Sequence, residues 1–192
     1  MIEVVANLLN SGAIFLAGRN SRHAWWIGIL ASLLFIDLFW TQHLYDNSAQ
    51  QVFFIVTNLF GWWNWSKEIP GSRKLPIRRS SARYLILLIA VSSLATWGYE
   101  IVLHHFVVAA RPFSTSLVLA FSILAQFLLM GRRIETWPCW LVVNGICIPV
   151  FAREKMFLTA ALCGIYFVIS AFAVLSWRRI IVTQNAVLPP TV

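Results

Sequence analysis

Long apolar runs are the feature that most constrains how this chain folds. A helix needs about 17 to 25 predominantly apolar residues to cross the hydrocarbon layer of a membrane. Seven runs approach or reach this length, at residues 2–17, 24–40, 51–65, 82–107, 115–130, 137–152 and 156–177. Isolated strands leave backbone groups unpaired in lipid, and no run shows the alternation of a barrel strand. We therefore predict an all-α integral membrane protein with seven transmembrane helices.

The composition argues against a soluble domain and a nucleic-acid-binding stripe. Hydrophobic residues make up 59% of the chain and charged residues only 11%, whereas soluble domains are about one quarter charged. The net charge is +8, but the basic residues form short clusters between the apolar runs. Only seven acidic residues are present, and the three cysteines lie inside apolar runs without metal-ligand spacing. We predict no cofactor and no metal site, and expect the cysteines to be buried packing residues.

The charges of the loops predict the orientation in the membrane. Basic residues follow the first, third, fifth and seventh spans, whereas the alternate loops are poorer in them. By the positive-inside rule the N-terminus lies outside, and the C-terminus and the basic loop 67–81 are cytoplasmic. The basic residues are Arg19, Arg22, Lys67, Arg73, Lys74, Arg78, Arg79, Arg83, Arg132, Arg133, Arg178 and Arg179.

A weak internal repeat suggests how the spans are grouped. Gly18-Arg19 ends the first span and Gly131-Arg132 ends the fifth, an offset of 131 − 18 = 113 that matches Ala31 with Asn144. Two three-helix units separated by one helix are parallel, which is a transporter architecture. We predict a 3+1+3 arrangement. Its parts are a three-helix bundle at 1–66, the basic loop 67–81, a linking helix at 82–107, a second bundle at 115–179 and a cytoplasmic tail at 180–192.

Two stripes of amides and tryptophans lie within the apolar spans. The first contains Gln51, Asn58, Trp62 and Trp65, and the second contains Trp137, Trp140 and Asn144. Their spacings of three, four and seven residues place each set on one helix face. An unpaired amide in hydrocarbon costs on the order of several kcal/mol, so these groups face the bundle interior or a cavity. Amides beside indoles suit a small planar ring that is cationic and carries hydrogen-bonding groups.

Structural interpretations of the same residues remain open. Tryptophan is enriched at membrane interfaces, and buried amides also hydrogen-bond neighbouring helices. We assign four tryptophans near helix ends to the interface, and Trp65 and Trp137 also fit there. The four are Trp25, Trp26, Trp40 and Trp177. For Asn58 and Asn144, spacing alone does not choose between a pocket and helix contacts.

One ionisable residue falls within a predicted span. Asp37 is a candidate for attracting a cationic substrate, although it lies three residues before Trp40 and also fits the outer interface. No nucleotide-binding GxxxxGK[ST] motif occurs, and no spacing of Ser, His, Asp or Cys suggests catalysis. We expect that the protein is not an enzyme.

Four short motifs together identify a family. They are Leu44-Tyr45, the run QVFF that begins at Gln51, NxxGWxxW from Asn58 to Trp65, and ExWxxWxxxN from Glu135 to Asn144. With them, nearly the whole chain resembles the PnuC family of bacterial vitamin transporters. That family is similar in fold to the sugar-transporting SWEET proteins, which have two three-helix bundles around a linking helix.

The resemblance implies an activity. It implies facilitated diffusion of nicotinamide riboside, or a nicotinamide mononucleotide-type precursor, across the bacterial inner membrane, followed by trapping by a cytoplasmic kinase. It also implies that both stripes face the substrate, and a homo-oligomer is compatible with it. The chain has Thr136 and Ala31 where members often carry asparagine. Thiamine, riboflavin or deoxynucleosides are therefore alternative substrates, and a non-transporting membrane assembly protein is an alternative of another class.

Overall fold

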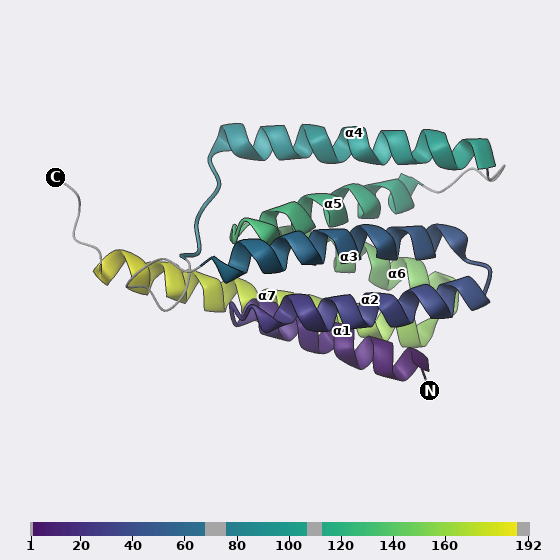
Figure 1. Ribbon diagram of the computed structural model, residues 1–192, viewed down its shortest axis with the longest axis horizontal. Coiled ribbons are helices and arrows are strands. Elements are labelled where there is room, and N and C mark those ends of the chain that lie inside the picture. The colour runs from purple at the N-terminus through teal and green to yellow at the C-terminus, as the bar shows by residue number, and fades with distance from the viewer. Residues whose placement is uncertain (1, 68–75, 107–112, 188–192) are drawn as a thin grey trace. The chain divides into compact units, whose positions relative to one another are not determined.

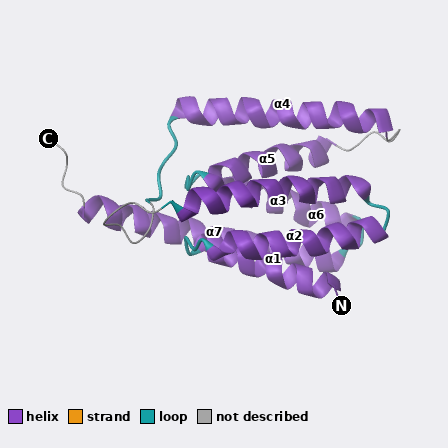
Figure 2. Ribbon diagram, viewed as in Figure 1, coloured by secondary structure: helices purple, strands orange, loops and turns teal. Residues whose placement is uncertain are grey.

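The chain folds into helices, as its apolar runs predict. The structure, a computed structural model, describes residues 2–67, 76–106 and 113–187, so much of the basic loop lies outside the described residues. The described residues form seven helices (Figures 1 and 2). They are α1 (Ile2–Gly18), α2 (His23–Thr41), α3 (Tyr45–Ser66), α4 (Ala82–Phe106), α5 (Phe113–Met130), α6 (Thr136–Arg153) and α7 (Phe157–Val187).

Two helices are longer than the apolar runs that predicted them. Helix α3 begins at Tyr45, six residues before Gln51 (51 − 45), and α7 continues to Val187, ten residues past Trp177 (187 − 177). At about 1.5 Å per residue, the 31 residues of α7 exceed the roughly 30 Å hydrocarbon layer. Hydropathy predicts the part of a helix that lies in lipid, whereas the backbone hydrogen bonds continue through polar residues beyond it.

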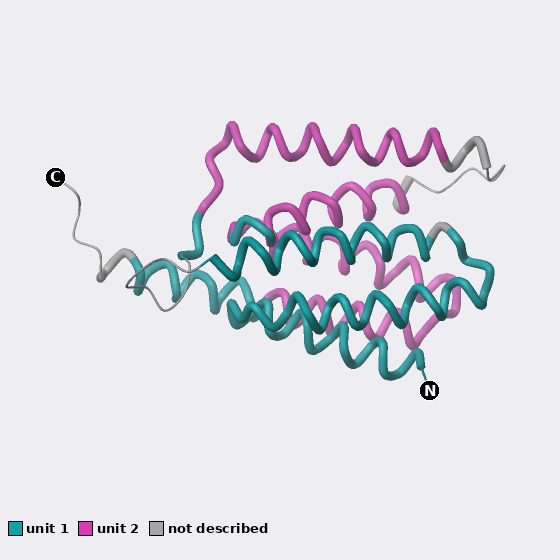
Figure 3. Tube along the Cα trace, viewed as in Figure 1, with its two compact units in different colours: residues 1–78, 130–132, 172–192 teal, residues 79–129, 133–171 magenta. Residues whose placement is uncertain are grey.

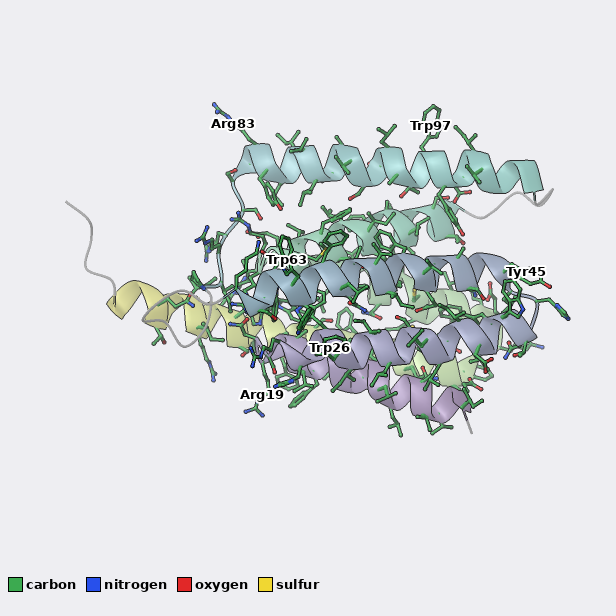
Figure 4. The ribbon with its side chains drawn as sticks, viewed as in Figure 1. Arg19, Trp26, Tyr45, Trp63, Arg83 and Trp97 are labelled. Carbon is green, nitrogen blue, oxygen red and sulfur yellow. The ribbon has the colours of Figure 1, made fainter. Side chains whose placement is uncertain are left out.

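Three of the described helical segments are long and apolar enough, by length and composition, to cross a membrane. They are His23–Thr41, Ala82–Val102 and Phe157–Gln184. Ile2–Gly18 and Thr115–Met130 are shorter apolar helices. Large apolar side chains are exposed on many of these helices; Trp97 on α4 is 64% exposed and projects outward in Figure 4. Such surfaces suit lipid rather than water as the solvent.

The chain divides into two compact units (Figure 3). Unit 1 contains residues 1–78, 130–132 and 172–192. Within it α1 packs against α2, and α2 packs against α3. The C-terminal part of α7 belongs to this unit, where the indole Nε1 of Trp177 donates to the Gly18 carbonyl at 3.1 Å.

Unit 2 contains residues 79–129 and 133–171. Its core joins α5 and α6 through Leu124, Ala125, Leu128 and Cys139. Partly buried side chains of three helices pack against this core, namely Tyr84, Leu85, Leu88, Phe121 and Trp140. Cys139 and Cys163 are buried and all three cysteines are free, in keeping with the predicted packing role.

Two kinds of turn recur along the chain at a constant offset. Asn20 and Arg132 have φ of 54° and 51°, and His43 and Lys155 have φ of 59° and 61°. Positive φ is uncommon outside glycine, and here it ends a helix in the left-handed conformation. Both pairs are 112 residues apart (132 − 20 and 155 − 43). The local backbone of the α1–α2 and α2–α3 turns is therefore repeated in the α5–α6 and α6–α7 turns.

The hydrogen bonds of these turns repeat at the same offset. Ser21 N donates to Leu16 O at 2.9 Å, as Arg133 N does to Leu128 O. Leu44 N donates to Phe39 O at 2.8 Å, and its counterpart bond joins Met156 N to Phe151 O at 2.9 Å. The predicted offset of 113 is thus wrong by one residue. Gly-Arg pairs set that offset, but the residue that reverses the chain is Asn20 in one repeat and Arg132 in the other.

The corrected offset pairs four buried tryptophans. Trp25 corresponds to Trp137 and Trp65 to Trp177, and their side chains are 2%, 1%, 3% and 0% exposed, respectively. The interfacial assignment is therefore wrong for Trp25 and Trp177, and it does not fit Trp65 or Trp137 either. Sequence position at a helix end does not reveal whether another helix covers the ring. Trp26 and Trp40 are exposed, as that assignment expects.

Candidate functional site

The predicted stripe of α3 faces α2 in unit 1. Trp62 is half-buried, and its ring centroid lies 4.8 Å from that of Trp26 at an interplanar angle of 57°. Trp26 is labelled on α2 in Figure 4. Asn58 is only 9% exposed, and Gln51 is half-buried. The stripe on α3 therefore holds two amides and a partly accessible indole on one helix face.

Glycines allow α2 and α3 to approach closely at this stripe. A Cβ built on Gly28 would lie 3.0 Å from Nδ2 of Asn58, and one built on Gly61 would overlap the ring of Trp25. Each helix therefore presents a glycine opposite a larger side chain of the other. Sequence analysis gave neither residue a role, although Gly61 belongs to the motif NxxGWxxW. The signal available was a glycine within an apolar helix, which marks close helix packing in membranes.

Trp65 is enclosed by side chains and backbone of unit 1. Its ring meets Trp25 edge-on, with centroids 5.2 Å apart, and lies 6.3 Å from the ring of Trp177. Its Nε1 donates to the Met130 carbonyl at 3.2 Å, and Nδ2 of Asn64 donates to the same oxygen at 2.7 Å. These contacts are those of a packing residue, so a substrate role for Trp65 stays a prediction.

Arg132 completes the surroundings of Trp65. Its Nη2 donates to the Trp65 carbonyl at 3.4 Å, and its Cζ lies 4.3 Å from the centroid of the Trp65 ring. Burial lowers the pKa of Arg132 to about 10, which leaves the guanidinium charged at neutral pH. A protein cation thus already stacks on this indole.

The second stripe lies on α6 in unit 2. Trp137 and Asn144 are buried, whereas Trp140 is half-buried beside the core cluster. Nδ2 of Asn144 donates to the Trp140 carbonyl at 2.8 Å, one turn earlier in the same helix. This bond uses one of two amide hydrogens. A carboxamide has a second donor hydrogen and an acceptor oxygen, so Asn144 retains capacity for a ligand.

The residues before this stripe hold unit 2 together. Thr136 is fully buried, and its Oγ1 donates to the Ala125 carbonyl of α5 at 2.8 Å. The carboxylate of Glu135 accepts bonds from Ser80 N at 3.0 Å and Ser80 Oγ at 2.9 Å. Glu135 belongs to the family motif, but sequence reasoning gave it no role. Its contacts tie the chain before α4 to the turn before α6.

Two further predicted positions lie on α2. Asp37 is exposed, as is Trp40 one turn later, and its proposed attraction of a cation stays a prediction. Ala31 is buried, but the structural repeat matches Asn144 with Ser32, because 144 − 112 = 32. Ser32 is also buried. The first repeat therefore carries a hydroxyl where the second carries an amide.

Apolar helices with buried amides and repeated turns define a multi-pass membrane protein of the transporter class. The chain belongs to the nicotinamide mononucleotide transporter family, whose model matches residues 1–179. This family consists of transporters and not enzymes.

Similar proteins of known name support this assignment. The nicotinamide riboside transporter PnuC of Escherichia coli is 23% identical, and the match covers 81% of this chain and 76% of that protein. The riboflavin/roseoflavin transporter RibM of Streptomyces davaonensis is 21% identical, over 81% of this chain and 74% of its own length. The crystal structure of the vitamin B3 transporter PnuC matches with a TM-score of 0.78 and 20% identity, covering 95% of this chain and 82% of that one. This structural likeness confirms the predicted all-helical fold.

Proposed function

We propose that this protein carries nicotinamide riboside, or a nicotinamide mononucleotide-type precursor, across the bacterial inner membrane by facilitated diffusion. The observation that carries the proposal is the pair of amides Asn58 and Asn144, buried on apolar helices of a chain in this transporter family. Polar side chains within membrane spans face the bundle interior or a cavity, where a polar substrate would also lie. A relative named a nicotinamide riboside transporter supports this substrate.

The chemistry of the side chains fits such a substrate. Nicotinamide riboside carries a flat cationic ring with a carboxamide. The indoles of Trp62 and Trp140 are half-buried and therefore retain surface for a cation–π contact worth roughly 0.5–2 kcal/mol. Gln51, Asn58 and Asn144 supply donors and acceptors that complement a carboxamide. We assign substrate contact to these five residues ahead of the enclosed Trp65 and Trp137.

We further infer a 3+1+3 arrangement in which α1–α3 and α5–α7 are equivalent bundles and α4 links them. The turns and tryptophans that recur 112 residues apart support it. A single linking helix makes two three-helix units parallel, with the N-terminus outside and the C-terminus cytoplasmic by the positive-inside rule. This is the architecture of the SWEET transporters.

Uptake without coupling follows from the residues available. The sequence has seven acidic residues and no nucleotide-binding loop, which leaves little machinery for ion or ATP coupling. Substrate therefore equilibrates across the membrane, and a cytoplasmic kinase retains it by adding a charged phosphate.

Riboflavin is the second candidate substrate. The relative RibM is named for riboflavin, and this chain has Thr136 where the nicotinamide riboside family often has asparagine. Riboflavin also presents a flat ring with hydrogen-bonding groups, although that ring is neutral.

Uptake into proteoliposomes tests these proposals. Purified protein is reconstituted and offered labelled nicotinamide riboside, nicotinamide mononucleotide, thiamine, riboflavin and a deoxynucleoside. We expect nicotinamide riboside to enter fastest, and its internal concentration to stop rising when it equals the external one. If riboflavin is the only compound taken up, the substrate is riboflavin and not nicotinamide riboside. Accumulation above equality driven by a sodium or proton gradient would contradict facilitated diffusion, and no uptake of any compound would favour an assembly protein.

A further inference from the structure

The contact between Gly28 and Asn58 belongs to a reciprocal pair of contacts between α2 and α3. Trp25 and Gly28 lie three residues apart on one face of α2, and Asn58 and Gly61 lie three apart on the facing side of α3. Because the helices are antiparallel, Trp25 lies against Gly61 while Gly28 lies against Asn58. Each glycine therefore provides the space that the opposing side chain occupies.

The two contacts differ in how tightly they are filled. At Gly61 an added Cβ would overlap the Trp25 ring, so this glycine is required for the helices to pack. At Gly28 the added Cβ would lie 3.0 Å from Asn58 Nδ2, 3.5 Å from its Cγ and 3.6 Å from its Oδ1. The whole carboxamide thus lies over the backbone of Gly28. A small displacement of the amide relieves this contact without separating the helices.

The second repeat fills the corresponding positions differently. At the structural offset of 112, Gly28 corresponds to Trp140 and Asn58 to Ser170, which is buried. In the first repeat, the second helix carries Gly28 and the third helix carries the amide of Asn58. In the second repeat, the corresponding positions carry Trp140 and the small hydroxyl of Ser170. Gly28 thus belongs with Asn58, as two parts of one local arrangement.

We propose that Gly28 is a positioning residue for Asn58 and through it determines specificity for substrates that carry a carboxamide. The missing side chain lets the amide of Asn58 lie flat against α2, which fixes the direction of its donor and acceptor. This inference rests on the proposed function, since it takes Asn58 to contact the substrate. Gly28 itself need not touch the substrate.

The variant Gly28→Ala tests the proposal. An added methyl group moves the Asn58 amide by a few tenths of an ångström, and a displacement of this size weakens an oriented contact by roughly three- to tenfold. Alanine is a better helix former than glycine, so stability need not fall. We expect weaker uptake and binding of nicotinamide riboside, with a smaller change for an analogue whose carboxamide is replaced by a methyl group.

Matched controls separate an effect on Asn58 from the general effect of replacing a glycine by alanine within a helix. Gly12→Ala and Gly164→Ala make the same substitution in helices where the new Cβ meets nothing within 4 Å. Both should retain wild-type affinity and selectivity. The decisive comparison is Gly28→Ala in an Asn58→Ala background, where no carboxamide remains to be displaced. There we expect Gly28→Ala to have no further effect on affinity.

The outcomes distinguish this inference from the proposed function. Gly28 does not position the amide if Gly28→Ala has the same affinity as the glycine controls. The same conclusion follows if Gly28→Ala lowers uptake of nicotinamide riboside and of the methyl analogue equally, and lowers it further in the Asn58→Ala background. In both cases the proposed function stands. If the wild-type protein takes up riboflavin and not nicotinamide riboside, the proposed substrate and the carboxamide specificity assigned to Gly28 are both wrong. A wild-type protein that takes up neither overturns both.

Discussion

The guanidinium of Arg132 lies over the ring of Trp65, with Cζ 4.3 Å from the ring centroid. The same side chain donates to the Trp65 carbonyl, so it holds the residue at both its ring and its backbone. One face of the indole is therefore occupied by a cation of the protein. Trp62, one turn earlier on the same helix, is only half-buried. Two tryptophans of one predicted stripe thus have different surroundings and different expected roles.

Replacing these two tryptophans separates stability from binding. Trp65→Leu removes a buried ring with several partners, and we expect a loss of about 3 kcal/mol or more in the free energy of unfolding. Trp62→Leu keeps an apolar surface but removes the ring quadrupole, so affinity for nicotinamide riboside falls by roughly 0.5–2 kcal/mol. Thermal melting and equilibrium binding of each variant provide the measurements. A stable Trp65→Leu protein with weakened binding would instead place Trp65 at the substrate.

Two asparagines allow a similar comparison. Asn144→Leu removes the donors and the acceptor proposed for the substrate, and we expect binding to weaken by roughly 1–3 kcal/mol. Asn64→Leu is the matched control, because Asn64 lies outside both predicted stripes and its Nδ2 donates to the Met130 carbonyl. It should lower the melting temperature and leave affinity unchanged. Normal affinity in a destabilised Asn144→Leu protein would favour the alternative in which this amide only holds helices together.

Variants of Thr136 test the position at which the family resemblance implies an asparagine. Thr136→Val keeps the shape but loses the bond to the Ala125 carbonyl, so we expect about 1 kcal/mol of destabilisation. Thr136→Asn adds volume at a fully buried position and should destabilise by about 1–3 kcal/mol. Chemical or thermal unfolding in detergent measures both. If Thr136→Asn is stable and binds nicotinamide riboside more tightly, this position contacts the substrate.

The inferred orientation makes a prediction for accessibility. In a cysteine-free background, an impermeant thiol reagent applied to intact cells should label Asn47→Cys, which lies in the first turn of α3. It should not label Ser72→Cys, which lies in the basic loop outside the described residues, until the cells are opened. The reverse pattern would place the N-terminus in the cytoplasm.

The sequence alone determined the helices and the faces on which their polar residues lie. Hydropathy and the spacing of residues such as Asn58 and Trp62 are local properties, so they predict a span and a stripe without knowledge of the partner helices. The same reasoning placed α3 and α7 correctly but not their ends at Tyr45 and Val187, because polar residues continue a helix without extending its apolar run.

Only the tertiary structure decided which side chains are enclosed and which remain available. Trp177 bonds to Gly18, 159 residues away, and Trp65 bonds to Met130, 65 residues away. The role proposed for Gly28 also depends on the tertiary structure, because the space beside Gly28 is occupied by Asn58 of another helix. Burial is set by the surface that packs against a residue. In this chain that surface comes from segments distant in sequence, which no local pattern contains.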